Sequence, residues 1–352
     1  MKKKTRVLIV DDSALIRNLF TELLSADPDI DVIGTAHDPY DAREKIKQLN
    51  PDVITLDVEM PKMDGISFLE KIMTLRPMPV VMVSSLTQKG AETTLRALEI
   101  GAVDYISKPA TQQTRNSLSA LKDDLIIKVK TAAGARVRSN QHTSANHNVD
   151  ESKILSFTPT SAANRRLIAI GSSTGGVEAL REVITVLPQN SPPIVITQHM
   201  PETFTASFAA RLNKICALTV QEARDSQKIA PGNVYIAPGG KHFEVVTRGN
   251  DYVCKISDGP LVSGHRPSVD VLFRSVKNAV GNLAIGVLLT GMGKDGAAGL
   301  LEMKNSGAFT IGQNEATCVV YGMPKAAKTI NAVMTELPLG KIPEEMLKRC
   351  NT

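Results

Sequence analysis

Short β-branched apolar runs alternate with amphipathic stretches along residues 5–130. Runs that are apolar on both faces are typical of strands buried in a parallel sheet, which needs a crossover segment between successive strands. These runs are Arg6–Val10, Val32–Ala36, Val53–Leu56, Val80–Val83 and Val103–Ile106. Five such strand–helix units predict a doubly wound α/β domain.

The same alternation resumes at residue 163. We expect strands at Leu167–Ile170, Ile194–Thr197, Val234–Ala237 and Ala284–Leu289, and helices at Val177–Leu187, Phe204–Ile215 and after Pro267. Two further runs, Phe243–Thr247 and Tyr252–Ile256, are joined through Gly249-Asn250, which predicts an antiparallel hairpin. The sequence therefore predicts a second doubly wound parallel sheet with one hairpin added.

Residues 131–162 interrupt the two patterns with small and polar side chains and show no lasting hydrophobic period. This composition is typical of a mobile linker. We therefore divide the 352 residues into a domain at 1–130, a flexible linker at 131–162 and a second domain at 163–352.

Composition excludes several classes of protein. No apolar run approaches the roughly 20 residues of a membrane span, so we expect no membrane insertion. Four cysteines without a CxxC pair fit a reducing compartment, and we expect a cytoplasmic protein. The chain has no Trp and few Tyr or Phe, which disfavours nucleic acid as a partner. Residues 163–352 carry 20 Lys+Arg and 15 Asp+Glu, a net charge of +5 that suits an acidic partner.

Acidic residues follow two predicted strands of the first domain. Asp11 and Asp12 come after the first strand and Asp57 after the third, so all three meet at the carboxyl edge of the sheet, where such folds bind ligands. Converging carboxylates repel one another unless a hard cation such as Mg²⁺ lies among them. Ser84 and Lys108 end the next two strands on the same rim. This set predicts a site that accepts a phosphoryl group, whereas a capping role for the aspartates would leave Lys108 unexplained.

On these residues, the first domain resembles the receiver domain of bacterial two-component response regulators, which is flavodoxin-like. The resemblance implies phosphorylation of Asp57 by a histidine kinase. It implies Mg²⁺ held by Asp12, Asp57 and the backbone carbonyl of Glu59, with Asp11 acting through water. It also implies that Ser84, Lys108 and Tyr105, at the position of the switch aromatic, sense the phosphoryl group.

A glycine-rich segment, Gly171–Gly176, lies between a predicted strand and helix of the second domain and fits G-x-S-x-G centred on Ser173. A sharp strand-to-helix turn presents a serine above a sheet, and the helix N-terminal N–H groups can stabilise an oxyanion. Two other readings stay open from this motif alone. One is a nucleotide-binding loop, although G-x-G-x-x-G is missing; the other is a simple tight turn.

A nucleophilic serine needs a base and an acid that orients it. His199, His242 and His265 are the candidates for the base, and the position of His199 at a strand end favours it. Asp295 lies in a glycine-rich loop after the strand Ala284–Leu289, on the same rim. Taken alone, an Asp-Gly at this place more commonly caps the following helix. Together, the three residues predict a Ser173–His199–Asp295 triad.

The second domain looks like the Rossmann-like α/β catalytic domain of chemotaxis protein-glutamate methylesterases. The matching segments are IGSSTGGVEAL, ITQHMP, YIAPGGKH, GHRPSVDVLF and GVLLTGMGKDGA. Ser172 stands where that family commonly has alanine, and the motif register selects Ser173. The resemblance implies an oxyanion and substrate loop that includes Thr174 and the N–H of Met292.

The two resemblances in this order imply a phosphorylation-activated methylesterase that needs no cofactor in the esterase domain. It would act on glutamate methyl esters of methyl-accepting chemoreceptor helices, with a chemotaxis histidine kinase as phosphodonor, and also deamidate receptor glutamines. We expect a monomer. The rival hypotheses are a transcription regulator, which would need a recognition helix, and a non-catalytic adaptor, which would not need an intact triad.

Overall fold

The structure is a computed structural model that describes residues 3–61, 63–85, 87–109, 115–137, 151–160 and 163–351. The chain forms two compact units, Met1–Ser144 and Ala145–Thr352, which we describe separately. The domain boundaries at 130 and 163 stay a prediction. Part of the expected linker, at 138–150 and 161–162, lies outside the described residues.

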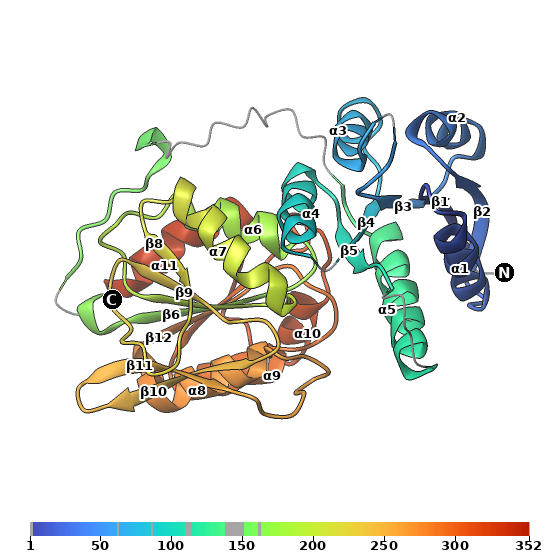
Figure 1. Cartoon of the computed structure of the whole chain (residues 1–352). Helices are drawn as coiled ribbons and strands as arrows, with labels where there is room; N and C mark the ends of the chain where they lie inside the picture. Colours follow the sequence, from blue (N-terminus) through green and yellow to red (C-terminus); the bar gives the residue numbers. More distant parts are fainter. Residues whose placement is uncertain are drawn as a thin grey trace. The chain divides into compact units, whose positions relative to one another are not determined.

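The first unit has a five-stranded sheet in the order β2-β1-β3-β4-β5, and every neighbouring pair is parallel. Helices α1 and α5 cover one face, and α2, α3 and α4 cover the other (Figure 1). This confirms the predicted doubly wound fold. The strands are β1 Thr5–Val10, β2 Ile30–Ala36, β3 Val53–Asp57, β4 Val80–Ser84 and β5 Asp104–Ser107; the helices are α1 Ala14–Ser25, α2 Pro39–Leu49, α3 Gly65–Leu75, α4 Gln88–Ile100 and α5 Arg115–Ala133.

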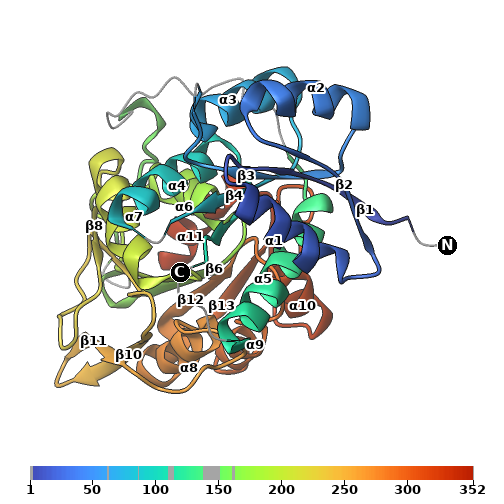
Figure 2. The ribbon, with the colours of Figure 1, turned by 45° about the vertical axis from the view of Figure 1, so that its right-hand side comes forward.

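The second unit has a seven-stranded parallel sheet in the order β14-β13-β12-β6-β7-β9-β8. Figure 2 shows α6, α7 and α11 on one side of this sheet and α8 and α9 on the other, with the hairpin β10–β11 beside α8. The strands are β6 Leu167–Ser172, β7 Ile194–Gln198, β8 Thr219–Glu222, β9 Asn233–Ile236, β10 His242–Arg248, β11 Asp251–Ser257, β12 Ala284–Leu288, β13 Phe309–Gln313 and β14 Thr335–Leu337. The helices are α6 Gly176–Ile184, α7 Glu202–Ile215, α8 Val269–Val280, α9 Ala297–Asn305, α10 Met323–Thr329 and α11 Ile342–Cys350.

Burial explains why the three central strands of this sheet are apolar without alternation. Every residue of β6, β7 and β12 is buried, because helices cover both faces. Helix α8 turns one stripe toward the sheet and the hairpin, with Val269, Leu272, Phe273 and Val276 at helical spacing, all fully buried. Since these three strands are parallel neighbours, their carboxyl ends form one rim of the sheet.

The part of the expected linker nearest the second unit is fixed to it. The N–H of Leu155 donates to the carbonyl of Val186 at 2.8 Å, and Asn190 Nδ2 donates to the carbonyl of Phe157 at 2.8 Å. The N–H of Thr160 donates to Asn351 Oδ1 at 3.0 Å. Residues 155–160 are thus bonded to the second unit, and α5 extends to Ala133 at the other end of the expected linker. The assignment of 131–162 as a flexible linker stays a prediction.

All four cysteines are free and buried. Burial raises the pKa of the Cys216, Cys254 and Cys350 thiols to about 12. No helix in the described ranges is long and apolar enough to cross a bilayer.

Candidate active site

Three carboxylates meet at the carboxyl edge of the first sheet. Asp11 follows β1 and Asp57 ends β3, and these strands are parallel neighbours with Val10 opposite Leu56. Oxygen atoms of Asp11, Asp12 and Asp57 lie within 4.8 Å of one another. Asp12 is exposed, whereas Asp11 and Asp57 are buried. The structure thus brings the predicted acids together.

Asp57 bonds to two donors within the described residues. Lys108 Nζ donates to Oδ2 at 2.7 Å, and the N–H of Glu59 donates to Oδ1 at 3.2 Å. Burial raises the pKa of Asp57 to about 6; the nearby charge of Asp11 adds to this rise, while the bond from Lys108 opposes it. Asp57 is therefore a carboxylate whose negative charge is only partly compensated.

The surroundings of Asp11 fit a divalent cation. Its Oδ1 accepts from the N–H of Ser13 at 2.9 Å, but its Oδ2 is buried and has no hydrogen-bond partner in the part of the chain that the structure describes. Lys108 Nζ lies 3.9 Å from that oxygen. A buried oxygen without a donor is costly unless something else binds it, and Mg²⁺ prefers such carboxylate oxygens.

The other residues predicted for this site lie around it. Ser84, buried at the end of β4, donates to the carbonyl of Gly90 at 3.3 Å. Tyr105 is buried on β5, where Lys128 Nζ lies 5.0 Å from its ring centroid. Burial, and then the nearby charges of Asp104 and Asp124, raise the pKa of Tyr105 well above its usual value. The phosphoryl-sensing roles of Ser84, Tyr105 and Lys108, and the metal-binding role of the Glu59 carbonyl, stay predictions.

Strand register places the predicted triad in the second unit. β6 lies between β7 and β12, with Ser172 opposite Gln198 and Gly171 opposite Leu288. Ser173 and His199 are thus the first residues beyond two paired strand ends. The N–H of Ser173 donates to the carbonyl of Thr290 at 3.0 Å, which attaches the serine turn to the loop that carries Asp295.

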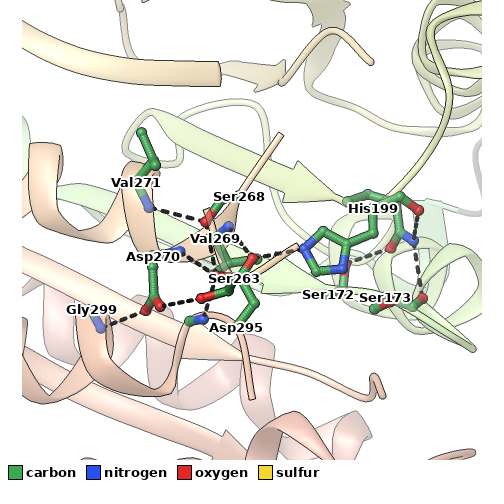
Figure 3. Close-up of polar contacts among 12 residues, drawn as sticks. Ser172, Ser173, His199, Ser263, Ser268, Val269, Asp270, Val271, Asp295 and Gly299 are labelled. Atoms are coloured by element: carbon green, nitrogen blue, oxygen red, sulfur yellow. Dashed lines mark hydrogen bonds and ion pairs between the residues drawn. The ribbon is translucent and has the colours of Figure 1, made fainter. Parts of the chain in front are cut away.

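His199, which follows β7, is in contact with Asp295, in the loop after β12. His199 Nε2 lies 2.8 Å from Asp295 Oδ2, and both side chains are almost fully buried. Figure 3 shows the imidazole between Asp295 and the Ser172–Ser173 turn. His199 Nδ1 is buried and has no hydrogen-bond partner among the described residues. The ring thus uses one nitrogen for the acid and keeps the other available on the side of the serines, as a general base requires.

Asp295 accepts five hydrogen bonds. Besides His199, its donors are the N–H groups of Val269 at 2.7 Å, Asp270 at 3.1 Å and Gly296 at 3.0 Å, and Ser268 Oγ at 2.8 Å. Burial alone would raise the pKa of Asp295, but the bond and charge of His199 and these donors outweigh it, so the pKa lies below its ordinary value. Asp295 is held as an anion.

The capping alternative for Asp295 is wrong. Gly296 occupies the N-cap position of α9, and no side chain caps that helix. Asp295 instead accepts from the first N–H groups of α8, the helix that begins 26 residues earlier. The positive end of that helix favours a negative charge at this place.

Ser172 and Ser173 differ in what their side chains can do. Ser172 is fully buried, and its hydroxyl donates to Gln198 Oε1 at 2.7 Å. The amide nitrogen of the same glutamine donates to the carbonyls of Ser173 at 3.0 Å and His199 at 3.1 Å. A Cβ on Gly176 would lie 2.0 Å from Gln198 Oε1, so a larger residue there would displace the Gln198 amide from its present bonds. The Ser172 hydroxyl is therefore bonded to Gln198, which also bonds the backbone of the serine turn. Ser173 is partly exposed.

The loop after β12 approaches the serine closely. A Cβ on Gly291 would lie 2.8 Å from Ser173 Cβ, so only glycine allows this approach. Thr290 Oγ1 donates to the carbonyl of Thr174 at 3.0 Å and accepts from the N–H of Val320. Met292, the residue after Gly291, is partly buried. Thr174 and Met292 thus lie on the two segments that flank Ser173, and their oxyanion role stays a prediction.

Sequence reasoning missed two residues that support the triad, Gln198 and Ser268. Both stand beside expected features, since Gln198 precedes the strand-end histidine and Ser268 is the N-cap of α8. His242, one of the alternative bases, is buried: Pro260 O lies 2.8 Å from its Nε2, and its Nδ1 accepts from the N–H of Ser268 at 3.3 Å. Both of its nitrogens are engaged in structural contacts.

The fold and the two sites define a receiver joined to an α/β hydrolase with a serine-type site, and comparisons with known proteins agree. The family described as CheB methylesterase matches residues 168–346, and the response regulator receiver domain matches residues 7–118. The chain belongs to the CheB methylesterase family.

Two curated relatives are named protein-glutamate methylesterase/protein-glutamine glutaminase. The protein from Salmonella typhimurium is 52% identical over 346 residues, which cover 98% of this chain and 97% of the relative. The protein from Yersinia pseudotuberculosis is 52% identical over 351 residues, 99% of this chain and 98% of the relative. The crystal structure of the Thermotoga maritima CheB methylesterase catalytic domain is 40% identical, with a TM-score of 0.51; the match covers 52% of this chain and 97% of that one.

Proposed function

We propose that the chain hydrolyses γ-glutamyl methyl esters on the cytoplasmic helices of chemoreceptors, deamidates receptor glutamines at the same site, and is activated by phosphorylation of Asp57. The observation that carries the ester chemistry is the buried pair of His199 and Asp295 beside Ser173. Nδ1 of the imidazole has no hydrogen-bond partner in the part of the chain that the structure describes. The names of the relatives support the substrate.

In the proposed reaction, Ser173 Oγ attacks the ester carbonyl carbon while His199 Nδ1 takes its proton. The imidazolium then protonates the departing methoxide, methanol leaves, and a glutamyl ester of Ser173 remains. Water attacks this ester with His199 again as base, which releases glutamate and restores Ser173. With a glutamine substrate, ammonia leaves in place of methanol.

Asp295 contributes by staying ionised. Its five hydrogen bonds stabilise the carboxylate, so it opposes the positive charge that appears on His199 during each proton transfer. We assign the developing oxyanion to backbone N–H groups beside Ser173, with Met292 and Thr174 as the flanking residues.

In the receiver unit, an Asp57 oxygen would attack the phosphorus of a phosphohistidine, and the bond from phosphorus to nitrogen would break. Asp12, Asp57 and the Glu59 carbonyl would hold Mg²⁺, with Asp11 acting through water. When bound, this cation offsets the negative charge that gathers around the phosphoryl group. Lys108 lies within contact distance of Asp57 to pair with a phosphoryl oxygen.

The two sites belong to different compact units, and we propose that the phosphoryl group takes no part in ester chemistry. Phosphorylation must act by shifting a conformational equilibrium. We propose that the unphosphorylated receiver inhibits the esterase. We also propose a monomer in the cytoplasm, where the basic second half would meet acidic receptor helices.

The test is hydrolysis of methyl-labelled receptor membranes by the full chain. Ser173→Ala should lower the rate of methanol release on the order of 10⁶-fold, as loss of a triad serine does. The matched control is Ser172→Ala, which removes a neighbouring hydroxyl that only bonds Gln198 and should keep most of the activity. Activity retained by Ser173→Ala and lost by Ser172→Ala would reverse the assignment.

Inhibition by the receiver has its own test. On one receptor preparation, a 163–352 fragment should exceed the unphosphorylated full chain, and phosphorylation should raise the activity of the full chain. A folded fragment that is less active than the unphosphorylated full chain would instead make the receiver a required activator.

A further inference from the structure

His265 lies flat against the imidazole of His199. The two ring centroids are 3.7 Å apart, and the ring planes differ by 13°. One edge of the His199 ring bonds Asp295, and its other nitrogen is on the side of the serine turn. The hydrogen bond fixes one point of the ring, but rotation about the Cβ–Cγ bond of histidine is soft. A flat contact on the ring face restricts that rotation.

The backbone that carries His265 is itself fixed. Val262 and His265 pair as an antiparallel bridge, with N–H to carbonyl distances of 3.1 and 2.9 Å. Between them, Ser263 and Gly264 have φ values of 54° and 83°, as in the tight turns that close hairpins. Arg266 Nη1 donates to the carbonyl of Gly259 at 2.9 Å, which anchors the loop on the other side of His265.

The same loop also reaches the acid of the triad. Ser263 Oγ donates to Asp270 Oδ2 at 3.3 Å, and the loop ends at Ser268, which donates to Asp295 at 2.8 Å. Residues 258–268, which we call the bracing loop, therefore contact His199 through its face and Asp295 through a hydrogen bond. The bracing loop thus contacts both His199 and Asp295 and fixes their positions relative to each other.

We propose that His265 is a positioning residue for His199: its ring fixes the plane of the catalytic imidazole, so that Nδ1 stays directed at Ser173 while Nε2 holds Asp295. This inference rests on the proposed role of His199 as the base. The property that His265 supplies is a flat ring at stacking distance, not a proton. A flat ring without nitrogen should therefore replace it, whereas a small side chain should not.

The test compares His265→Phe with His265→Ala in the full chain. On methyl-labelled receptor membranes, His265→Ala should lower kcat about 10- to 100-fold, because misplacement of a reacting group by about 1 Å costs about that much, while KM stays within about threefold. His265→Phe should keep kcat within about threefold of the wild type and leave the pH profile unchanged. Met334→Ala, at an exposed residue outside the bracing loop, is the control and should behave as wild type.

A spectroscopic measurement needs no activity. The proton between His199 Nε2 and Asp295 should give a downfield NMR signal that broadens or is lost in His265→Ala and is kept in His265→Phe. Wild-type kcat in His265→Ala would overturn the proposal, as would a rise in KM alone, which would indicate a substrate contact. Equal damage in both variants would mean that a proton on His265 is needed, and would also overturn it. If the wild type hydrolyses no ester, the proposed function fails, whereas the NMR comparison still decides the positioning role.

Discussion

Asp57 and Asp295 are both buried carboxylates at the carboxyl edge of a parallel sheet, yet their surroundings are opposite. Asp295 accepts five hydrogen bonds, and its pKa lies below the ordinary value. Asp57 accepts two from described residues, lies beside Asp11, and has a pKa raised to about 6. The same position at the edge of a parallel sheet therefore provides two very different environments for a carboxylate charge.

The difference follows from what each carboxylate must do. In the proposed reaction, Asp295 has to stay charged and in one orientation while a proton moves on and off His199, and five described groups hold it there. In the proposed phosphorylation, Asp57 has to accept groups that arrive from outside. Its charge is only partly compensated, and an Asp11 oxygen beside it has no donor among the described residues. If Asp57 accepted as many hydrogen bonds as Asp295, its carboxylate would be better stabilised but less reactive toward a phosphoryl group.

The largest effect that we expect from this comparison is that of Asp295→Asn on catalysis. The amide cannot oppose the imidazolium and presents N–H groups to donors, so ester hydrolysis should fall about 10⁴-fold. Stability should also fall by about 1–3 kcal/mol, because buried N–H groups of α8 lose a charged acceptor. Hydrolysis of labelled receptor and urea unfolding measure the two effects. The control is the exposed Asp251→Asn, and equal effects from both changes would contradict the comparison.

Neutralising the other carboxylate should change stability in the opposite direction. Asp57→Asn should abolish phosphoryl incorporation from a phosphohistidine donor, yet stabilise the receiver by about 1–3 kcal/mol at pH 7 without Mg²⁺. The gain arises because the buried charge is removed, and it is reduced because Lys108 loses its partner. Hydrogen exchange of the β3 and β4 amides measures this gain in local stability. The control is Asp31→Asn, at an exposed residue. A destabilised receiver would show that Asp57 is as well satisfied as Asp295.

The same reasoning predicts a pH dependence. The pKa of Asp57 is about 6 in the folded chain and near 3.8 ordinarily, so between these values the folded state binds more protons. Its contribution to stability therefore falls as pH rises from about 4 to about 6, and the cost persists above that range. Without Mg²⁺, protection of the β3 amides, corrected for the intrinsic exchange rate, should decrease over this window in the wild type but not in Asp57→Asn. Addition of Mg²⁺ at pH 7 should restore the protection of the β3 amides in the wild type but not in Asp57→Asn.

The smallest expected effect is that of Ser268→Ala, which removes one of the five donors to Asp295. The remaining four keep the carboxylate ionised, so we expect kcat to fall about tenfold or less and stability to fall by about 1 kcal/mol. Ser306→Ala removes a hydroxyl that bonds a carbonyl at the end of α9 and is the matched control for stability. A loss of kcat as large as that of Asp295→Asn would mean that Asp295 depends on a single donor.

The sequence predicted the apolar central strands and the hairpin β10–β11, but not β8, β13 and β14. β8 and β14 lie at the sheet edges, and Val220 is the only fully buried residue of either. β13 is mostly buried, yet it contains Thr310 and Gln313, whose side chains bond the carbonyl of Ala332 and the N–H of Thr290. A hydrophobic pattern cannot reveal polar residues that are buried because of a distant partner.

The same limit applies to the site. Strand ends were enough to predict that Ser173, His199 and Asp295 lie on one rim, because parallel strands bring their carboxyl ends together. The bonds from α8 to Asp295 and the stacking of His265 on His199 join residues far apart in the chain. Those contacts depend on the path of a loop, which local periodicity does not encode.

The parallel pairing of β6 with β7 and β12 has a consequence for how such an enzyme can diverge. The positions of Ser173, His199 and the Asp295 loop depend on backbone register, and register is sensitive to a slip of one residue but tolerant of side-chain exchange. Substitutions can therefore accumulate in the covering helices with little effect on the chemistry, whereas a one-residue insertion within these strands would be eliminated by selection. Lineages of this enzyme should drift widely in sequence while the lengths of their central strands stay constant.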